Sequence, residues 1–120
     1  MRKIKKSLLL DAISAAQNYL PKEFICFLGG EEKTKTVTEI VFIPARTSGD
    51  AASIEGLAMP FDEGIVGSLH SHPFSGSMPS RQDKRFFSKY RLNIIFGHPY
   101  AIENTGFYDQ KGEKTRVILE

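Results

Sequence analysis

The stretch IVGSLHSHPFSGSMPSRQDKRFF, residues 65–87, divides into a strand, a loop and a helix. Its first eight residues, Ile65–His72, begin with apolar and β-branched side chains and contain no proline, which is typical of a strand. The next residues are rich in glycine, serine and proline and indicate a loop. Ser80 is followed three residues later by an acid, which is a signature of a helix N-terminus. We therefore expect a second helix to begin at Ser80.

Two histidines of this strand form a candidate metal site. His70 and His72 lie two positions apart, so their side chains point to the same face of the strand. The loop can bring Asp83, in the first turn of the helix, back over the strand end. Two imidazoles and one carboxylate are the three-ligand set of a catalytic zinc, with water in the fourth position.

A structural zinc site is the first alternative, and it would need a fourth protein ligand, usually cysteine. Cys26 and His98 are the remaining candidates. Cys26 lies in an apolar strand, where a free cysteine commonly behaves as a small buried hydrophobe. His98 is followed by proline at the end of a strand and is interpreted as an ordinary strand-end residue.

Ser80 and Asp83 also have a purely structural interpretation. A serine with an acid three residues later caps a helix, which contributes about 1 kcal/mol and implies no chemistry. The two histidines on the preceding strand favour a further role. The positive end of the helix dipole suits both a metal-bound carboxylate and a nearby oxyanion.

A hydrolytic zinc site also needs a base for its water. Glu23 opens an apolar strand directly after the first helix, which is an unfavourable place for a carboxylate unless it is exposed. Its simplest interpretation is a solvated residue at a strand start. Glu63 and Asp62, just before the histidine strand, compete with Glu23 by position.

The rest of the chain predicts an α+β fold in which a mixed or antiparallel β-sheet is sandwiched by two main helices. A polar loop with one short strand near Ile54 is expected over residues 45–64. A Gly29–Gly30 turn is expected to close the strand before it. The expected helices cover residues 7–20 and begin again at residue 80, the second with Phe86, Phe87 and Tyr90 facing inward. The expected strands cover residues 23–28, 36–44, 65–72 and 92–99, and the first two of these form an antiparallel hairpin. Residues 106–109 and 115–120 are expected to form a closing hairpin.

Length and composition limit the function. A chain of 120 residues, 41% of them hydrophobic, indicates a single globular domain over residues 1–120. A net charge of +2, from 16 basic and 14 acidic residues, does not favour a nucleic-acid partner. The basic residues near the N-terminus are interpreted as a solvated segment; they are Arg2, Lys3, Lys5 and Lys6.

The expected location is the cytoplasm. A single cysteine indicates a reducing compartment. The apolar run Leu8–Leu10 is too short for a secretory signal, and no stretch approaches the roughly 20 apolar residues of a membrane span. We therefore expect no membrane partner.

The spaced set of polar residues resembles the JAMM (MPN-plus) metalloprotease signature. The set begins with a glutamate on an early strand, Glu23. His-Ser-His-Pro follows at residues 70–73, and after six further residues comes Ser-x-x-Asp at residues 80–83. Gly67, three residues before His70, also fits the family. The resemblance covers essentially the whole chain and is closest to compact stand-alone prokaryotic members, archaeal ones in particular.

This resemblance implies a cytidine-deaminase-like architecture and a residue-by-residue assignment. His70, His72 and Asp83 would bind one Zn²⁺ per chain, with water as the fourth ligand. Glu23 would take a proton from that water and deliver it to the leaving amine. Ser80 would stabilise the oxyanion of the tetrahedral intermediate.

The resemblance also implies a substrate class. Family enzymes of this type cleave isopeptide bonds between a lysine side chain and the C-terminal glycine of ubiquitin or a ubiquitin-like small modifier, whose tail would add a strand to a sheet edge. Residues 45–64 are the expected substrate wall. Two alternatives are a peptidase that trims the tail of a sulfur-carrier protein and a non-catalytic MPN module that binds a protein partner. Exposed sheet edges make a homodimer possible.

Overall fold

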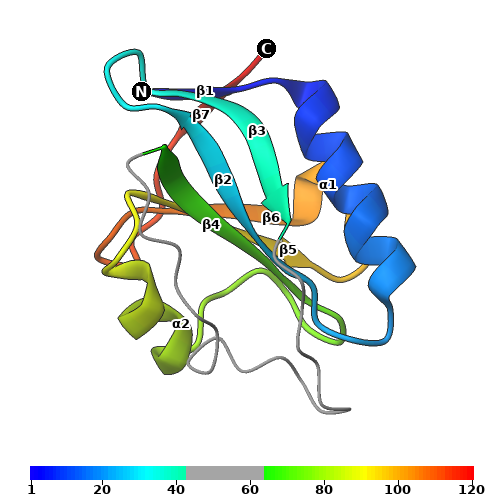
Figure 1. Cartoon of the computed structure of the whole chain (residues 1–120). Coiled ribbons are helices and arrows are strands. Elements are labelled where there is room, and N and C mark those ends of the chain that lie inside the picture. The colour runs from blue at the N-terminus through cyan, green and yellow to red at the C-terminus, as the bar shows by residue number, and fades with distance from the viewer. Residues whose placement is uncertain (43–63) are drawn as a thin grey trace.

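The computed structural model describes residues 1–42 and 64–120, which form one sheet with a helix on each face (Figure 1). The two α-helices are α1 (Lys6–Tyr19) and α2 (Arg81–Phe87), and a short 3₁₀ helix, η2, covers Ile102–Asn104. The strands are β1 (Arg2–Ile4), β2 (Ile25–Glu31), β3 (Thr36–Phe42), β4 (Ile65–His72), β5 (Leu92–Gly97), β6 (Thr105–Tyr108) and β7 (Val117–Leu119).

The sheet is mixed, which confirms the predicted α+β class. Its strand order is β6-β5-β4-β2-β3-β1-β7. The central strand β4 pairs with β2 in antiparallel orientation and with β5 in parallel orientation. The predicted hairpin of β2 and β3 is also present. In the described parts of the chain, no helix is long and apolar enough to cross a bilayer.

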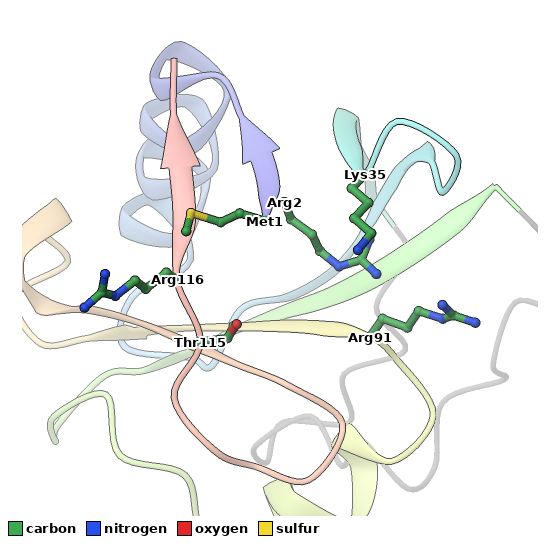
Figure 2. A pocket seen from close by; sticks show the side chains of 6 residues that line it. All are labelled: Met1, Arg2, Lys35, Arg91, Thr115 and Arg116. Carbon is green, nitrogen blue, oxygen red and sulfur yellow. The ribbon is translucent and has the colours of Figure 1, made fainter.

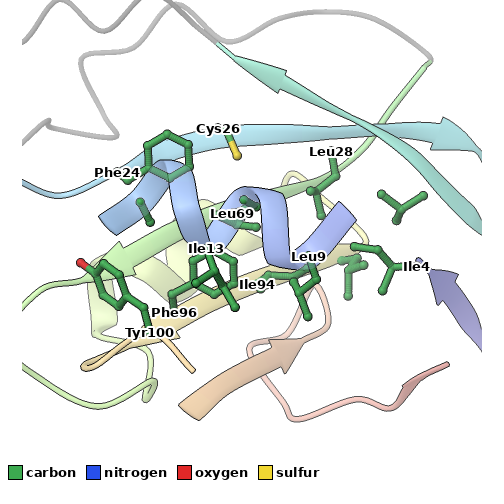
Figure 3. Close-up of a cluster of buried hydrophobic side chains, with 14 of the residues drawn as sticks. Ile4, Leu9, Ile13, Phe24, Cys26, Leu28, Leu69, Ile94, Phe96 and Tyr100 are labelled. Carbon is green, nitrogen blue, oxygen red and sulfur yellow. The ribbon is translucent and has the colours of Figure 1, made fainter. Parts of the chain in front are cut away.

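Alternating residues of the central strands fill two separate cores. Four residues at helical spacing on α1 are buried against one face of the sheet, beside Cys26, Leu69 and Phe96 (Figure 3). The neighbouring residue Phe27 points to the other face and packs with the α2 side chain of Phe86. The cysteine is fully buried, as its apolar context predicted.

The N-terminal segment forms a strand, which the prediction of a solvated basic segment did not include. Ile4 is buried, and β1 pairs in parallel with both β3 and β7. Arg2 forms an ion pair with Glu32. Lys3 remains exposed, as do the lysines at positions 5 and 6. The sequence pattern of this short strand was weak because only one apolar side chain, Ile4, faces the core.

The predicted closing hairpin was also wrong in its strand pairing. A tight turn does follow β6, where the Asp109 carboxylate accepts the N–H groups of Lys111 and Glu113. Tyr108 then makes one antiparallel bridge with Lys114. Beyond this bridge the chain leaves β6, and β7 pairs with β1 at the opposite edge of the sheet.

Two smaller predictions also changed. The strand predicted over residues 23–28 does not end at a Gly29–Gly30 turn. It is β2, which continues through both glycines with a register shift. A Cβ at Gly30 would overlap the backbone of Thr36, so the close approach of β3 requires glycine there. Tyr90 is buried as predicted but lies beyond the end of α2. The short strand expected near Ile54 lies outside the described residues.

Candidate metal centre

Strand β4 and helix α2 bring the candidate ligands together. His70 and His72 lie in the last three residues of β4, on the face that α2 covers, and the ring of His70 packs against that of Phe87. Asp83 lies in the first turn of α2 and is buried. The alternation of side chains along β4 therefore places both imidazoles beneath the N-terminus of the helix, as the sequence predicted.

Three ligand atoms converge at this point. The Nε2 atoms of His70 and His72 lie 3.2 Å apart. Asp83 Oδ1 lies 3.2 Å from His70 Nε2, and its Oδ2 lies 3.2 Å from His72 Nε2. One atom from each residue can therefore contact a single ion, since all the candidate ligand atoms lie within 4.8 Å of one another.

Neighbouring groups orient these atoms. The Nδ1 atom of His72 donates a hydrogen bond to the Gly76 carbonyl at 2.9 Å, because a carbonyl can only accept. The Nε2 lone pair of the neutral ring is then free to bind a metal. Asp83 Oδ2 accepts the Ser80 N–H at 2.9 Å. The Gly76 carbonyl is a contributor that spacing arguments did not identify, because any loop carbonyl could have served.

The donor set fits a divalent cation. With both rings neutral and His72 protonated at Nδ1, a lone pair of that residue faces a carboxylate oxygen and the other imidazole at close range. The His72 lone pair and the Asp83 oxygen, 3.2 Å apart, repel one another unless a proton or a cation lies between them. Two imidazoles with a carboxylate are the ligands of catalytic zinc. His70 makes its polar contacts through Nε2, since its Nδ1 is buried without a hydrogen-bond partner among the described residues.

Electrostatics at the cluster favour an ionised aspartate. Burial alone would raise the pKa of the Asp83 carboxyl. Hydrogen bonds from His70 and His72, the charge of His70 and the hydrogen bond from the Ser80 amide outweigh burial and hold that pKa well below its usual range. The hydrogen bond to Asp83 raises the pKa of His72. The carboxylate is therefore available as a ligand at neutral pH.

Glu23 lies beside this cluster. Ile25 pairs with His70, so the antiparallel register extended by two residues places Glu23 alongside His72. Ser71 points to the opposite face and holds the chain there: its Oγ accepts the Phe24 N–H at 2.8 Å, and its N–H donates to the Phe24 carbonyl at 3.0 Å. The glutamate next to this clamp is thereby directed toward the α2 face.

The environment of Glu23 differs from that of a solvated strand-start residue. The side chain is half-buried. Burial raises the pKa of the Glu23 carboxyl, and the charges of His70 and His72 only partly offset this effect. A carboxyl with a raised pKa beside a metal-binding cluster is suited to exchange protons near neutral pH.

Ser80 forms the predicted helix cap. Its Oγ accepts the Asp83 N–H at 3.1 Å, and the Asp83 carboxylate accepts the Ser80 N–H, which completes a capping box. The Ser80 residue is exposed. The hydroxyl proton is not used in the capping box, so the residue can also donate a hydrogen bond outward.

The remaining candidates do not join the cluster. Cys26 packs on the α1 face, away from His70 and His72. His98 is exposed beyond the end of β5. The described residues therefore supply three protein ligands and no fourth. Glu63 and Asp62, the competing bases, lie outside the described residues.

Comparisons with known proteins identify the family of the chain. Residues 5–109 match the family of prokaryotic homologs of the JAB domain. A probable metalloprotease from Haloferax volcanii is 33% identical over 111 residues, which cover 85% of this chain and 69% of that protein.

Solved structures show the same fold. One, described as JAMM, a metalloprotease-like zinc site in the proteasome and signalosome, has a TM-score of 0.77 and 26% identity; the match covers 100% of this chain and 98% of the other. A JAB1/MPN domain protein from Archaeoglobus fulgidus has a TM-score of 0.76 and 26% identity, with 100% and 97% covered. Because the family match spans most of the chain, this protein belongs to the prokaryotic homologues of the JAB domain, a family of JAMM-type zinc metalloproteases.

Proposed function

We propose that the protein is a zinc-dependent isopeptidase that hydrolyses the bond between the C-terminal glycine of a ubiquitin-like small modifier and a lysine amine. One observation carries this proposal: polar residues from three separate chain segments converge at one end of the sheet. Glu23 precedes β2, His70 and His72 end β4, and Ser80 and Asp83 begin α2.

The proposed metal ligands are His70, His72 and Asp83, which would hold one zinc ion per chain with water in the fourth position. When bound, zinc polarises the scissile carbonyl and lowers the pKa of a water molecule to about 7. The protein's contribution is to hold the three ligand atoms in place. The carbonyl of Gly76 and the amide of Ser80 do this through hydrogen bonds to the ligands.

Glu23 is the proposed general base and acid. Its carboxylate would take a proton from the attacking water as the water oxygen bonds to the scissile carbonyl carbon. The same proton would then pass to the lysine nitrogen as the carbon–nitrogen bond breaks. The raised pKa of this half-buried carboxyl supports both transfers, since it lies closer to neutral pH than that of a solvated glutamate.

Ser80 is the proposed oxyanion donor. Its oxygen accepts the Asp83 N–H and caps α2, while its own proton remains to donate to the developing negative charge on the substrate carbonyl oxygen. The capping and catalytic interpretations of this serine are therefore compatible.

The outer edge of β3 supports binding of an extended tail. β1 pairs only with the first two residues of β3, Thr36 and Val37. From Thr38 to Phe42, this edge has no strand partner among the described residues. The edge runs toward the end of the sheet that holds Glu23, so an added strand would lead toward the metal centre. The proposal includes a single catalytic domain over residues 1–120 and a cytoplasmic location.

A cleavage assay on a Gly-Gly–lysine isopeptide conjugate of a small modifier tests this function. The zinc-loaded protein should release the modifier. Glu23→Gln should keep its zinc and lose hydrolysis, because the amide cannot accept the proton. His72→Ala should lose zinc content and hydrolysis together. Glu113→Gln, the same change at an exposed residue, is the matched control and should behave as the wild type.

Two outcomes would count against parts of the proposal. Hydrolysis by Glu23→Gln at the wild-type rate would remove this residue as the base and direct attention to Glu63. Failure of the zinc-loaded wild type on the isopeptide, together with cleavage of a linear sulfur-carrier tail, would replace the substrate class and retain the metal centre.

A further inference from the structure

A cleft lies on the protein, apart from the candidate metal centre. It has a volume of about 380 Å³ and is lined by six residues, Met1, Arg2, Lys35, Arg91, Thr115 and Arg116 (Figure 2). This size falls at the lower end of the range for small-molecule sites, about 300–1,000 Å³.

The cleft lies at the opposite end of the sheet from the metal centre. Arg91 immediately precedes β5, whose first residue, Leu92, pairs with Gly67 near the start of β4. His72, in contrast, pairs with Gly97 at the other end of the same two strands. Ligand binding in the cleft can therefore be measured separately from metal binding and hydrolysis.

The cleft gathers positive charge from four separate segments of the chain. Arg2 belongs to β1, Lys35 to the β2–β3 turn, Arg91 to the approach to β5, and Arg116 to the approach to β7. The fold therefore brings together cations that are distant in sequence. Figure 2 shows the ends of the Arg2 and Lys35 side chains pointing toward one another.

One carboxylate already bridges part of this cluster. The Glu32 carboxylate accepts hydrogen bonds from both terminal nitrogens of Arg2, at 2.8 and 2.9 Å, and from one terminal nitrogen of Arg91, at 3.0 Å. The two guanidinium groups are thus spaced so that a single oxyanion can contact both. Lys35 and Arg116 have no ion pair among the described residues. The single charge of Glu32 is shared by Arg2 and Arg91, so it balances only one of the four side-chain cations that line the cleft.

We propose that this cleft binds the diphosphate group of a small phosphorylated ligand. An excess of like charge destabilises the folded protein, and an anion with several charges would relieve the repulsion. Guanidinium groups match phosphate oxygens in fork geometry, and the Thr115 hydroxyl adds a neutral donor. The lining contains no aromatic ring on which a nucleobase could stack, so the affinity resides in the diphosphate.

Isothermal titration calorimetry with inorganic pyrophosphate tests this site on the intact protein. Lys35→Gln should weaken binding about tenfold, because it removes one charge-assisted hydrogen bond. Lys33→Gln, the matched control in the same turn, removes an equal charge from an exposed residue that does not line the cleft and should change the affinity less than about twofold. Glu32→Gln should strengthen binding, because it removes the competing carboxylate.

Further arms identify the source of the diphosphate. Similar affinities for pyrophosphate and ADP would support recognition of the diphosphate alone. AMP binding as tightly as pyrophosphate would overturn the diphosphate assignment. Absence of pyrophosphate binding at low ionic strength would overturn the site, and so would equal weakening by Lys33→Gln and Lys35→Gln. Pyrophosphate should also raise the melting temperature of the wild type more than that of Lys35→Gln.

Discussion

Ser80 caps α2 and is also the proposed oxyanion donor. Its oxygen accepts the Asp83 N–H, and the Asp83 carboxylate accepts the Ser80 N–H in return. The cap therefore also restrains the aspartate that faces His70 and His72. Loss of the hydroxyl should lower stability, because the helix cap is lost, and should lower turnover, because the proposed oxyanion donor is lost.

Ser80→Ala separates these two contributions. We expect the free energy of unfolding to fall by about 1 kcal/mol, the usual value of a helix N-cap. We expect turnover to fall by about 10²–10³, the usual value of one oxyanion donor. Thermal melts and single-turnover cleavage measure the two effects. Ser80→Thr, which keeps the hydroxyl, should retain most of both; an alanine variant with lower stability and unchanged turnover would leave the serine as a cap only.

At the scale of elements, the end of β5 supports the loop between β4 and α2. Gly97 lies against this loop, where a Cβ would come within 2.6 Å of the Ser77 nitrogen and 2.8 Å of the Gly76 carbonyl carbon. The same Gly76 carbonyl accepts the hydrogen bond from His72. The packing of β5 therefore sets the orientation of His72, a proposed metal ligand in β4.

Gly97→Ala should displace the Gly76 carbonyl and loosen His72. Loss of such a supporting hydrogen bond commonly lowers metal affinity by about 10- to 100-fold, which a competition titration with a zinc chelator would measure. Gly76→Ala is the control, because a Cβ there meets nothing within 4 Å. Equal zinc affinity in wild type and Gly97→Ala would show that the loop does not depend on β5 for its position.

At the scale of the whole molecule, the two ends of the chain complete one edge of the sheet. β1 lies between β3 and β7, and Arg2 of β1 forms an ion pair with Glu32, the residue that follows β2. The hydrogen bond from Arg2 lowers the pKa of the Glu32 carboxyl, with further contributions from the charges of Arg2 and Arg91. This ion pair therefore contributes a pH-dependent part of the stability of the sheet edge.

The contribution of Glu32 should vanish in acid. A carboxyl with a lowered pKa in the folded state stabilises above the pKa of the unfolded chain, about 4.3, and the contribution is lost as pH falls through the folded pKa. The free energy of unfolding of wild type should exceed that of Glu32→Gln by at most about 1 kcal/mol at neutral pH, since the pair is partly exposed. Denaturant titrations should show this difference narrowing below about pH 4. A difference that is constant with pH would remove the ion pair as its cause.

Local patterns explain why so much of the site could be predicted. His70 and His72 share a face because of strand alternation, and Ser80 caps α2 because it lies three residues before Asp83. Neither relation requires knowledge of the rest of the molecule. The burial of Cys26 likewise followed from its apolar neighbours.

The failures concern long-range pairing. The turn after Tyr108 formed as its residues predicted, but β7 left that turn to pair with β1. Any strand offers the same backbone donors and acceptors to either neighbour, so its partner is chosen by burial and by the closure of the whole sheet. The extension of β2 through Gly29 and Gly30 depended on the approach of β3 in the same way.

By itself, the sequence determined the local geometry of the candidate metal-binding residues, the two helices and the family. These depend on spacing within short segments, and backbone geometry turns spacing into shared faces and caps. Only the tertiary structure decided that Glu23 lies beside the candidate metal-binding cluster, that Gly76 orients His72, and that cations from four segments line one cleft. These relations depend on how strands distant in the chain are ordered in the sheet, because packing rather than local spacing selects that order.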